Sequence, residues 1–304
     1  MAQNIYNLRD FENPIVIWTG GSFSPPTSGH IEVARIVATY ILKLYPSSNV
    51  FLYFVPVSKN YSKNSVKNNS IGGDSDGIRL EMLSMATDHL NKTEVSGKIK
   101  YSVSNLEIEQ ARSVPTYESI EMLKSKIREN SRKDIPDSSF FISLGQDNVE
   151  GIISGKWAMP FTLLSKNIIC VPRPLTDANQ TANTSRQLIS KINIENMLIK
   201  ENITPIPTID QLISKILIVN ESIPDAIVNT SSTKLRSKLQ EYYKTREHGF
   251  ISELKTMTLP EIIDLIIKNN YYNKKLMTGG FISKRKSKLK QLRKKTHKKK
   301  THKL

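Results

Sequence analysis

The chain alternates short apolar runs with amphipathic helical patterns, and this alternation limits the fold more than any other feature. Six runs rich in β-branched and aromatic residues lie at residues 15–18, 50–55, 99–103, 140–144, 168–171 and 216–219. Several are continuously apolar, which is typical of strands covered on both faces. Two helical patterns lie between these runs. The apolar face of the first consists of Val33, Val37, Tyr40, Ile41 and Leu44, and that of the second of Ile120, Leu123 and Ile127. We therefore predict an α/β fold: a Rossmann-like, mostly parallel sheet with helices on both faces.

Length and cysteine content place the chain in a broad class. Its 304 residues can bury a substantial core. Cys170 is the only cysteine, so no disulfide can form within the chain, and a reducing, intracellular compartment is expected. The N-terminus lacks the features of a signal peptide, and no apolar run approaches the roughly 18 residues of a membrane span. We expect a cytoplasmic or nuclear protein without membrane contact, and the sequence leaves a homo-oligomer open.

The net charge of +16 is concentrated at one end of the chain. Residues 283–304 contain twelve Lys or Arg and no acidic residue, and without them 32 basic residues face 28 acidic ones. The sequence "TGG" at 278–280 separates this stretch from the last helical pattern. We predict a domain over residues 1–277 that ends in helices, with an insertion at about 174–214, and a disordered basic low-complexity tail over 278–304.

The segment "TGGSFSPPTSGH", residues 19–30, joins the first predicted strand to the first helix. Such a loop lies at the carboxyl ends of parallel strands, where ligands bind. Glycines let backbone N–H groups approach an anion, and the helix directs its positive end at the same point. The two prolines keep the helix from beginning before Ser28 or Gly29, so His30 falls in its first turn. The segment alone leaves two interpretations open: a phosphate site, or a turn whose histidine caps the helix.

A second candidate phosphate site lies about two hundred residues later, in "VNTSSTKLRSKL", residues 228–239. Hydroxyl groups at a helix start can bind free N–H groups or an anion. Arg236 lies three residues after Thr233 and four after Ser232, on the same helical face. Hydroxyls and a guanidinium would then converge on one point, as a phosphate site requires. A capped surface helix with a solvated arginine is the alternative.

Together these two segments resemble the GSFxP, (H/T)xGH and SSTxxR motifs of the nucleotidylyltransferase superfamily, with Thr230 in place of the usual Ile. The resemblance implies that His30 and Arg236 are the catalytic residues. It further implies that the ATP phosphates contact Gly20, Gly21, Ser22, Phe23, Thr27, Gly29, Ser232 and Thr233.

Other segments resemble the nicotinamide and nicotinate mononucleotide adenylyltransferases. In "SLGQDNVEGIISGKW", residues 143–157, the resemblance implies that Gly145 and Asp147 border the nucleotide and that Trp157 stacks on the pyridine ring. Packing of Trp157 in the core is the alternative. "IICVPRPL", residues 168–175, implies that Arg173 lies on the adenine side.

Two looser matches complete this resemblance. In "LEIEQARSVPTYESIEML", residues 106–123, Thr116 and Tyr117 are implied to lie near the mononucleotide, with Thr116 as a plain helix cap the alternative. In "VPVSKNYSKNSV", residues 55–66, Lys63 is implied to contact phosphate, or else is a solvated loop lysine.

The function implied is transfer of AMP from ATP to nicotinamide or nicotinate mononucleotide, which forms NAD or deamido-NAD and pyrophosphate. Mg²⁺ would be bound mainly through the ATP phosphates and water, so no protein metal site is expected. A pantetheine-phosphate adenylyltransferase or a cytidylyltransferase is the nearest rival. A hypothesis from another class is that the basic tail binds nucleic acid without sequence preference. Its T-H-K repeats resemble tails of proteins from large DNA viruses, so a viral source stays open.

Overall fold

The computed structural model describes residues 5–58, 75–172, 208–219 and 230–273. Several predictions lie outside these residues: Lys63, Arg173, most of the insertion and the basic tail. None of the helices in the described part of the chain is long and apolar enough to cross a membrane.

The predicted strands form one sheet in the order β3-β2-β1-β4-β5-β6. Every pairing between neighbouring strands is parallel, so the predicted Rossmann-like sheet is confirmed. All six predicted apolar runs are strands, and β1 continues past the predicted run to Gly21. Their bounds are β1 (Pro14–Gly21), β2 (Asn49–Pro56), β3 (Ile99–Val103), β4 (Phe140–Gly145), β5 (Asn167–Val171) and β6 (Ile216–Ile218).

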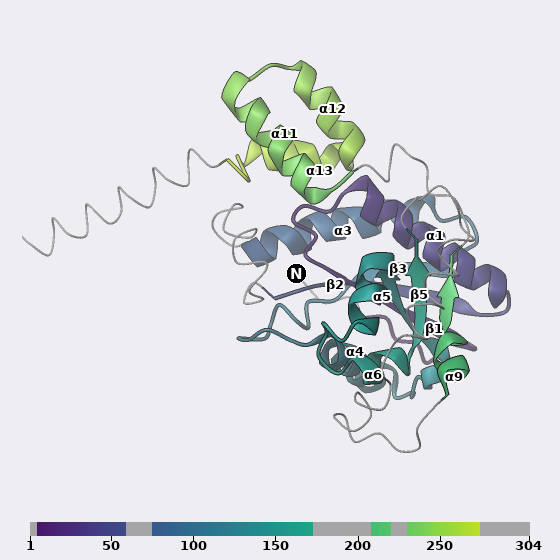
Figure 1. Ribbon diagram of the computed structural model, residues 1–304. Coiled ribbons are helices and arrows are strands. Elements are labelled where there is room, and N and C mark those ends of the chain that lie inside the picture. Colours follow the sequence, from purple (N-terminus) through teal and green to yellow (C-terminus); the bar gives the residue numbers. More distant parts are fainter. Residues whose placement is uncertain (1–4, 59–74, 173–207, 220–229, 274–304) are drawn as a thin grey trace, which may run out of the picture.

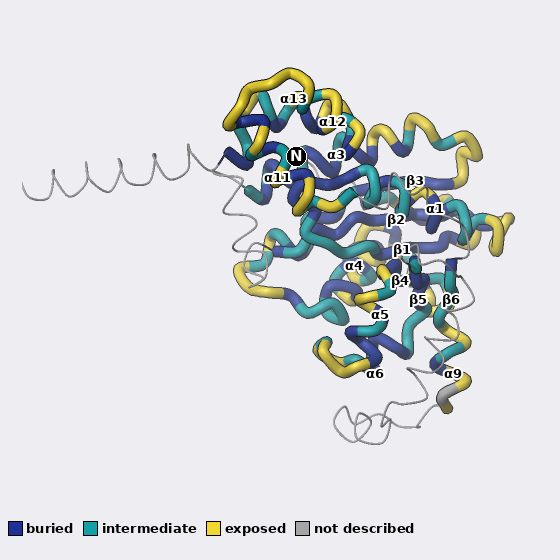
Figure 2. Tube along the Cα trace, turned by 45° about the horizontal axis from the view of Figure 1, so that its top comes forward, coloured by how far each residue is buried: buried dark blue, intermediate teal, exposed yellow. Residues whose placement is uncertain are grey.

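Helices cover both faces of the sheet (Figure 1). One face packs against α1 (Ser28–Leu44) and α3 (Ser75–Thr93). The other face packs against α4 (Thr116–Ser131), α5 (Gln146–Ile153), α6 (Pro160–Leu164) and α9 (Ile209–Ile213), and the single-turn 3₁₀ helix η1 (Asp137–Ser139) precedes β4. The inner strands β2, β1, β4 and β5 are therefore buried on both sides for most of their length, as their apolar sequences indicated (Figure 2).

The two predicted helical faces differ in outcome. In α4, Ile120, Leu123 and Ile127 are fully buried, as predicted. In α1, Val37 and Ile41 are buried, but Leu44 at the last turn is 46% exposed, so its predicted burial is wrong. The physical reason is that Leu44 is the last residue of the helix, three positions after Ile41, the last of its buried residues.

The C-terminal helices α11 (Ser232–Thr245), α12 (Gly249–Met257) and α13 (Pro260–Lys268) form a cluster of their own at one end of the molecule (Figure 1). Their core includes Ile78 and Met82 from the first half of α3. The second half of α3 packs on the sheet through Leu83, Ala86 and Leu90. Helix α3 thus holds the C-terminal cluster at a defined place beside the sheet.

The order of the strands creates a crevice between β1 and β4. These two strands are neighbours, with Thr19 opposite Ser143, yet β1 continues into α1 on one face and β4 into α5 on the other. The chain therefore separates at the carboxyl ends of these strands, which is where ligands bind in open parallel sheets. The loop over residues 19–30 and the segment that begins at Gly145 flank this crevice.

Candidate nucleotide-phosphate site

The loop between β1 and α1 has its carbonyl oxygens held by donors from distant parts of the chain. The Val57 N–H donates to the Gly21 carbonyl over 3.0 Å. Four further carbonyl oxygens accept from side chains: Ser22 O from Arg79 Nη1 (3.0 Å), Ser24 O from Arg236 Nη1, Pro25 O from Ser232 Oγ (2.8 Å) and Pro26 O from Thr258 Oγ1 (2.9 Å). Four different segments thus fix one short loop.

This arrangement sets the direction of the loop's N–H groups. In a planar trans peptide, the carbonyl of one residue and the N–H of the next point in opposite directions. Because the carbonyls of Gly21 and Ser22 are bonded inward, the N–H groups of Ser22 and Phe23 are directed away from those donors. Residues 25 and 26 are prolines and contribute no N–H. The loop can therefore offer N–H groups to an anion while its carbonyl oxygens, which would repel one, are kept away.

The side chain of Phe23 is part of the core, so only its backbone is available to a ligand. Phe23 is 1% exposed, and its ring meets those of Phe54 and His30 edge-on at 5.5 and 5.2 Å. Its φ of 43° lies in the left-handed region, which is unfavourable for a bulky residue. These contacts hold the backbone in a conformation that the sequence around it would not adopt alone.

His30 caps the helix and keeps one ring nitrogen for another partner. Its Nδ1 accepts the Thr27 N–H at 3.0 Å and lies 2.8 Å from Thr27 Oγ1. A neutral imidazole whose Nδ1 accepts carries its proton on Nε2, which is then a donor. Burial lowers the pKa of His30 to about 4, so the ring is neutral near pH 7 in the unliganded protein. The two interpretations of His30, helix cap and phosphate ligand, are therefore compatible.

Some of the free backbone N–H groups in the first turn of α1 have hydrogen-bond partners within the chain. The Gly29 N–H donates to Thr230 Oγ1 at 3.2 Å, and the Ser28 hydroxyl lies 3.3 Å from the same oxygen. In this structure Gly29 therefore bonds to the second motif. Thr230, which stands where the superfamily motif usually has Ile, thereby joins the two motifs, a role that the sequence did not indicate.

The second motif lies against the first, as predicted from the sequence. Ser231 is the N-cap of α11 and accepts the Lys234 N–H at 3.1 Å. Ser232 and Arg236 donate to the loop, and Arg236 Nη2 also lies 3.1 Å from Thr233 Oγ1. Burial lowers the pKa of the Arg236 guanidinium. These bonds use two of the five N–H donors of Arg236, so the guanidinium keeps donors for a ligand.

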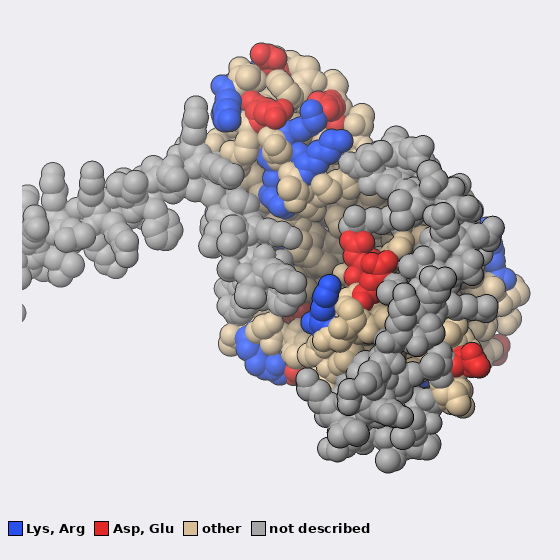
Figure 3. Space-filling view, in the orientation of Figure 1, with Lys and Arg blue, Asp and Glu red and all other residues tan. Residues whose placement is uncertain are grey.

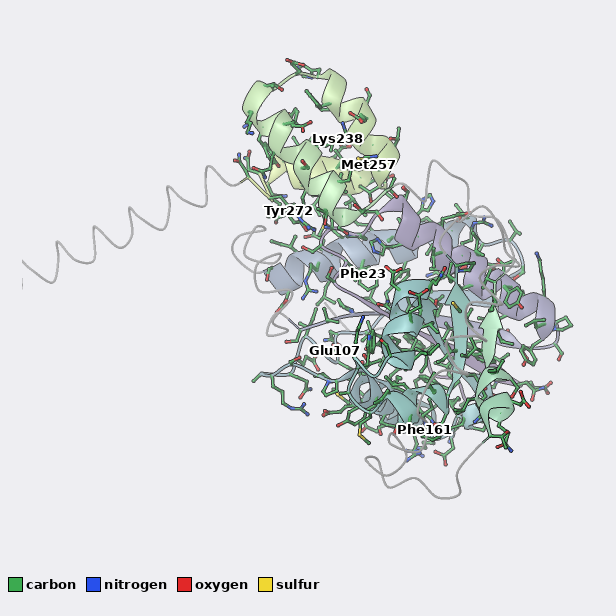
Figure 4. All side chains as sticks on the ribbon, viewed as in Figure 1. Phe23, Glu107, Phe161, Lys238, Met257 and Tyr272 are labelled. Carbon is green, nitrogen blue, oxygen red and sulfur yellow. The ribbon has the colours of Figure 1, made fainter. Side chains whose placement is uncertain are left out.

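The surface is hollowed between the C-terminal helices and the α/β body, with Lys and Arg side chains on the helical side (Figure 3). Phe23 and Tyr272 lie at this junction, and Glu107 lies on the side of α4 (Figure 4). The Tyr272 hydroxyl is 3.2 Å from Ser24 Oγ, which adds a contact between the end of the described chain and the loop.

Positions 20 and 21 require glycine for a packing reason that the sequence did not indicate. A Cβ on Gly20 would overlap the six-membered ring of Trp18, and one on Gly21 would lie 2.9 Å from Phe23 Cζ. Trp18 is 3% exposed and donates through Nε1 to Ser119 Oγ at 3.1 Å. The glycines thus make room for buried aromatic rings, besides allowing a ligand to approach the backbone.

The segment after β4 is placed beside the loop by the β1–β4 pairing. Gly145 is the N-cap of α5 and is exposed, and Asp147 is exposed in the first turn. Trp157 packs on Gly151 of α5, where an added Cβ would lie 2.8 Å from Nε1, and against the core. It is nevertheless only partly buried. One part of the Trp157 side chain therefore packs in the core, as the alternative interpretation proposed, and another part stays accessible.

Thr116 and Tyr117 begin α4. The N-cap is Pro115, so Thr116 is the first helical residue and the cap alternative is wrong for it. Tyr117 is partly buried against the same core that Trp157 contacts. Both residues lie at the end of the connection from β3, on the α5 side of the sheet.

Sequence reasoning missed two buried charged residues near the site, Arg79 beneath the loop and Glu107 on the side of α4. Arg79 is fully buried, and its Nη2 lies 2.6 Å from Asp76 Oδ1. Glu107 is 2% exposed and accepts hydrogen bonds from the Ser119 side chain and the Ser58 backbone. Burial raises the pKa of Glu107 to about 7, although the Arg79 charge opposes this shift. One signal in the sequence was available: Arg79 stands next to Ile78 and four residues before Leu83, on the apolar face of α3.

No group of three or more His, Cys, Asp and Glu side chains among the described residues is placed to hold a metal ion.

Fold and loop together define a Rossmann-like α/β protein with a candidate nucleotide-phosphate site at the crevice between β1 and β4. No protein-family model matches the chain. Among curated proteins, the chain is similar to a probable nicotinate-nucleotide adenylyltransferase of Bacillus licheniformis, with 27% identity over 141 residues. The alignment spans 46% of this chain and 58% of that relative. This curated relative is of the class that the motif resemblance indicated, and the similarity covers less than two thirds of its length.

Among solved structures, the chain is similar to the nicotinic acid mononucleotide adenylyltransferase of Plasmodium falciparum. The complex of that protein with NaAD has a TM-score of 0.50 and 22% identity, and covers 84% of this chain and 96% of its own. Its complex with APC covers the same shares, with a TM-score of 0.48 and 20% identity. The first of these similarities supports the α/β fold described above.

The packing role of Gly20 predicts a loss of stability in Gly20→Ala. The added methyl group displaces the Trp18 ring and strains its bond to Ser119, so we expect the free energy of unfolding to fall by about 1–3 kcal/mol. The measurement is denaturant unfolding followed by tryptophan fluorescence. Gly249→Ala is the matched control, because a Cβ there meets open space at the start of α12. Equal effects in the two variants would contradict the packing role.

The buried carboxyl of Glu107 predicts a pH-dependent gain of stability in Glu107→Gln. The folded chain holds the Glu107 proton up to about pH 7, whereas the unfolded chain releases it near the ordinary value of 4.5. Stability of the natural chain relative to the variant should therefore fall as the pH rises from about 4.5 to about 7, by up to roughly 3 kcal/mol. Urea unfolding of both chains at about pH 5 and about pH 8 measures this difference. Parallel pH profiles would show that Glu107 titrates normally.

Proposed function

We propose that the protein transfers AMP from ATP to a pyridine mononucleotide, with pyrophosphate as the second product. The observation that carries this proposal is the loop over residues 19–30, whose carbonyls are bonded inward, in part by Ser232 and Arg236 of the second motif. That arrangement suits a polyphosphate at the β1–β4 crevice. The similarity to a probable nicotinate-nucleotide adenylyltransferase supports the same reaction, with nicotinate mononucleotide as the first substrate to test.

The reaction needs positioned charge more than covalent chemistry from the chain. A 5′-phosphate oxygen of the mononucleotide attacks the α-phosphorus of ATP, the bond from that phosphorus to the bridging oxygen breaks, and pyrophosphate leaves. We assign Nε2–H of His30 and the N–H groups of Ser22 and Phe23 to the charge that develops on the α- and β-phosphates. The remaining donors of Arg236, with the Thr233 hydroxyl, bind the leaving pyrophosphate. Mg²⁺, when bound to the ATP phosphates, would neutralise part of their charge.

The mononucleotide is assigned to the side of the crevice formed by β4, α5 and the start of α4. Gly145 and Asp147 lie at the end of β4, and the accessible part of Trp157 suits stacking on a pyridine ring. Thr116 and Tyr117 lie on the same side of the sheet. Lys63 and Arg173, outside the described residues, remain predictions for phosphate and adenine contacts.

The direct test supplies the purified protein with ATP, Mg²⁺ and either nicotinate or nicotinamide mononucleotide. We expect dinucleotide and pyrophosphate in equal amounts, with the nicotinate substrate used more efficiently. Chromatography of the products measures both. Absence of a dinucleotide from either substrate, in a folded sample that binds ATP, would contradict the proposal. Products formed only with phosphopantetheine or with CTP and an alcohol phosphate would favour the rival transferases.

A control for this assay removes residues 281–304. Their unopposed positive charge would bind nucleic acid in a salt-dependent way, as a function added to transfer. Retained transfer with lost binding to a DNA column assigns the tail an accessory role. Lost transfer would instead show that the tail belongs to the catalytic domain.

His30 can be tested with two substitutions that separate its roles. In His30→Gln, the new side chain can still accept the Thr27 N–H, as in the common capping box, but it lacks the imidazole Nε2–H. We expect its melting temperature to stay near that of the natural chain while kcat falls by about two orders of magnitude or more. His30→Ala should lose turnover and also about 1 kcal/mol of stability. Normal turnover in His30→Gln would leave His30 with the capping role alone.

A further inference from the structure

We propose that Arg79 is a positioning residue that sets the ATP-binding conformation of the β1–α1 loop. Its guanidinium lies beneath the loop and donates through Nη1 to the Ser22 carbonyl at 3.0 Å. Its Nη2 is held by Asp76 at 2.6 Å. This inference rests on the proposed function, because it assigns Arg79 a role in binding the ATP of that reaction.

The bond from Arg79 to the Ser22 carbonyl determines the direction of one donor of the candidate site, the Phe23 N–H. The Ser22 carbonyl and the Phe23 N–H belong to the same planar peptide group and point in opposite directions. When Arg79 holds the carbonyl inward, the Phe23 N–H is directed outward, toward the place assigned to phosphate. Phe23 itself has a φ of 43°, so this peptide does not take its orientation from local preference. A distant side chain must hold it.

The energetics of burial argue against a merely structural role for Arg79. Its side chain is 0% exposed, and its Nε is a buried donor without a partner among the described residues. A buried ion pair often contributes less to stability than apolar side chains of the same volume, and an unpaired N–H adds a further cost. The neighbouring positions on this face of α3, Ile78, Met82 and Leu83, are apolar and buried. An aliphatic side chain at position 79 would suit that surface, but it could not hold the Ser22 carbonyl.

The geometry also requires arginine in particular. The two nitrogens that bind Ser22 and Asp76 belong to one rigid, planar fork, so the position of the acid in α3 determines the position of the carbonyl in the loop. A lysine at this position would keep the charge, but its single nitrogen cannot occupy both places. The positive charge beneath the loop would remain in that variant, and the orientation of the peptide would be lost.

The test is Arg79→Lys, compared with the natural chain in ATP binding and in steady-state kinetics. We expect the Kd for ATP, measured by calorimetry without mononucleotide, to rise about tenfold or more. KM for ATP should rise with it, while KM for the mononucleotide stays within about twofold, because a loop peptide on the ATP side is affected. A merely structural residue would change both KM values together or neither.

Ser131→Ala is the matched control. Its hydroxyl accepts a buried hydrogen bond from the Leu8 N–H at 2.8 Å, at the end of α4 away from the loop. We expect this variant to lose stability and to keep the natural Kd for ATP.

If Arg79→Lys does not fold, Asp76→Asn is the second test variant, because it weakens the partner that orients the guanidinium. A raised Kd for ATP with an unchanged KM for the mononucleotide in that variant supports the proposal.

Two outcomes would overturn the inference. One is a natural Kd for ATP in folded Arg79→Lys, or in folded Asp76→Asn when the lysine variant fails to fold. The other is an equal rise of both KM values. Failure of the proposed function has a different signature, since the natural chain itself would then form no dinucleotide.

Discussion

The inward bonding of the carbonyl oxygens in the β1–α1 loop is the interaction on which the rest of the site depends. A loop that binds a polyphosphate must present N–H groups and keep carbonyl oxygens away, yet every peptide contains both groups. Donors must therefore come from elsewhere in the chain, and here they come from α3, α11 and the residue that follows α12. The contact between two motifs that lie far apart in the sequence is one way in which the fold meets this need.

The C-terminal helices position two of the side chains that hold this loop. Their shared core with the first half of α3 holds α11 at a fixed distance from the sheet, and Ser232 and Arg236 reach the loop only from that position. Helix α3 contacts both parts of the molecule, because its second half packs on the sheet and its first half, which carries Arg79, packs on the C-terminal helices. The site is thus built on packing between elements, and the Gly/Pro loop supplies only one of its components.

The parts of the structure that sequence could predict are those determined by local composition. Short runs rich in apolar and β-branched residues identified all six strands, because the strands of a parallel sheet covered by helices are largely buried. The prolines at 25 and 26 placed the start of α1 at Ser28 or Gly29, and the helix begins at Ser28, because proline fixes its own φ and disfavours helical backbone in the residue before it. The approach of the two motifs was also predictable, although it rested on a resemblance to a known family. The predicted burial of Leu44 was wrong, because the apolar spacing of a helix does not show at which turn its packing ends.

The parts that could not be predicted depend on which residue meets which in three dimensions. Nothing local shows that Gly20 faces the ring of Trp18, that Thr230 bonds to Gly29, or that Arg79 turns toward Ser22. The two interpretations left open for the loop and for the second motif are also compatible with each other. His30 caps the helix through Nδ1, and this bond determines that Nε2 carries the proton. Ser232 and Arg236 hold the loop with some of their donors, and the loop then presents its N–H groups beside the donors that remain. In the proposed site the same side chains would therefore serve local capping and ligand binding, because a group that must meet a phosphate in a defined direction first has to be held by the chain.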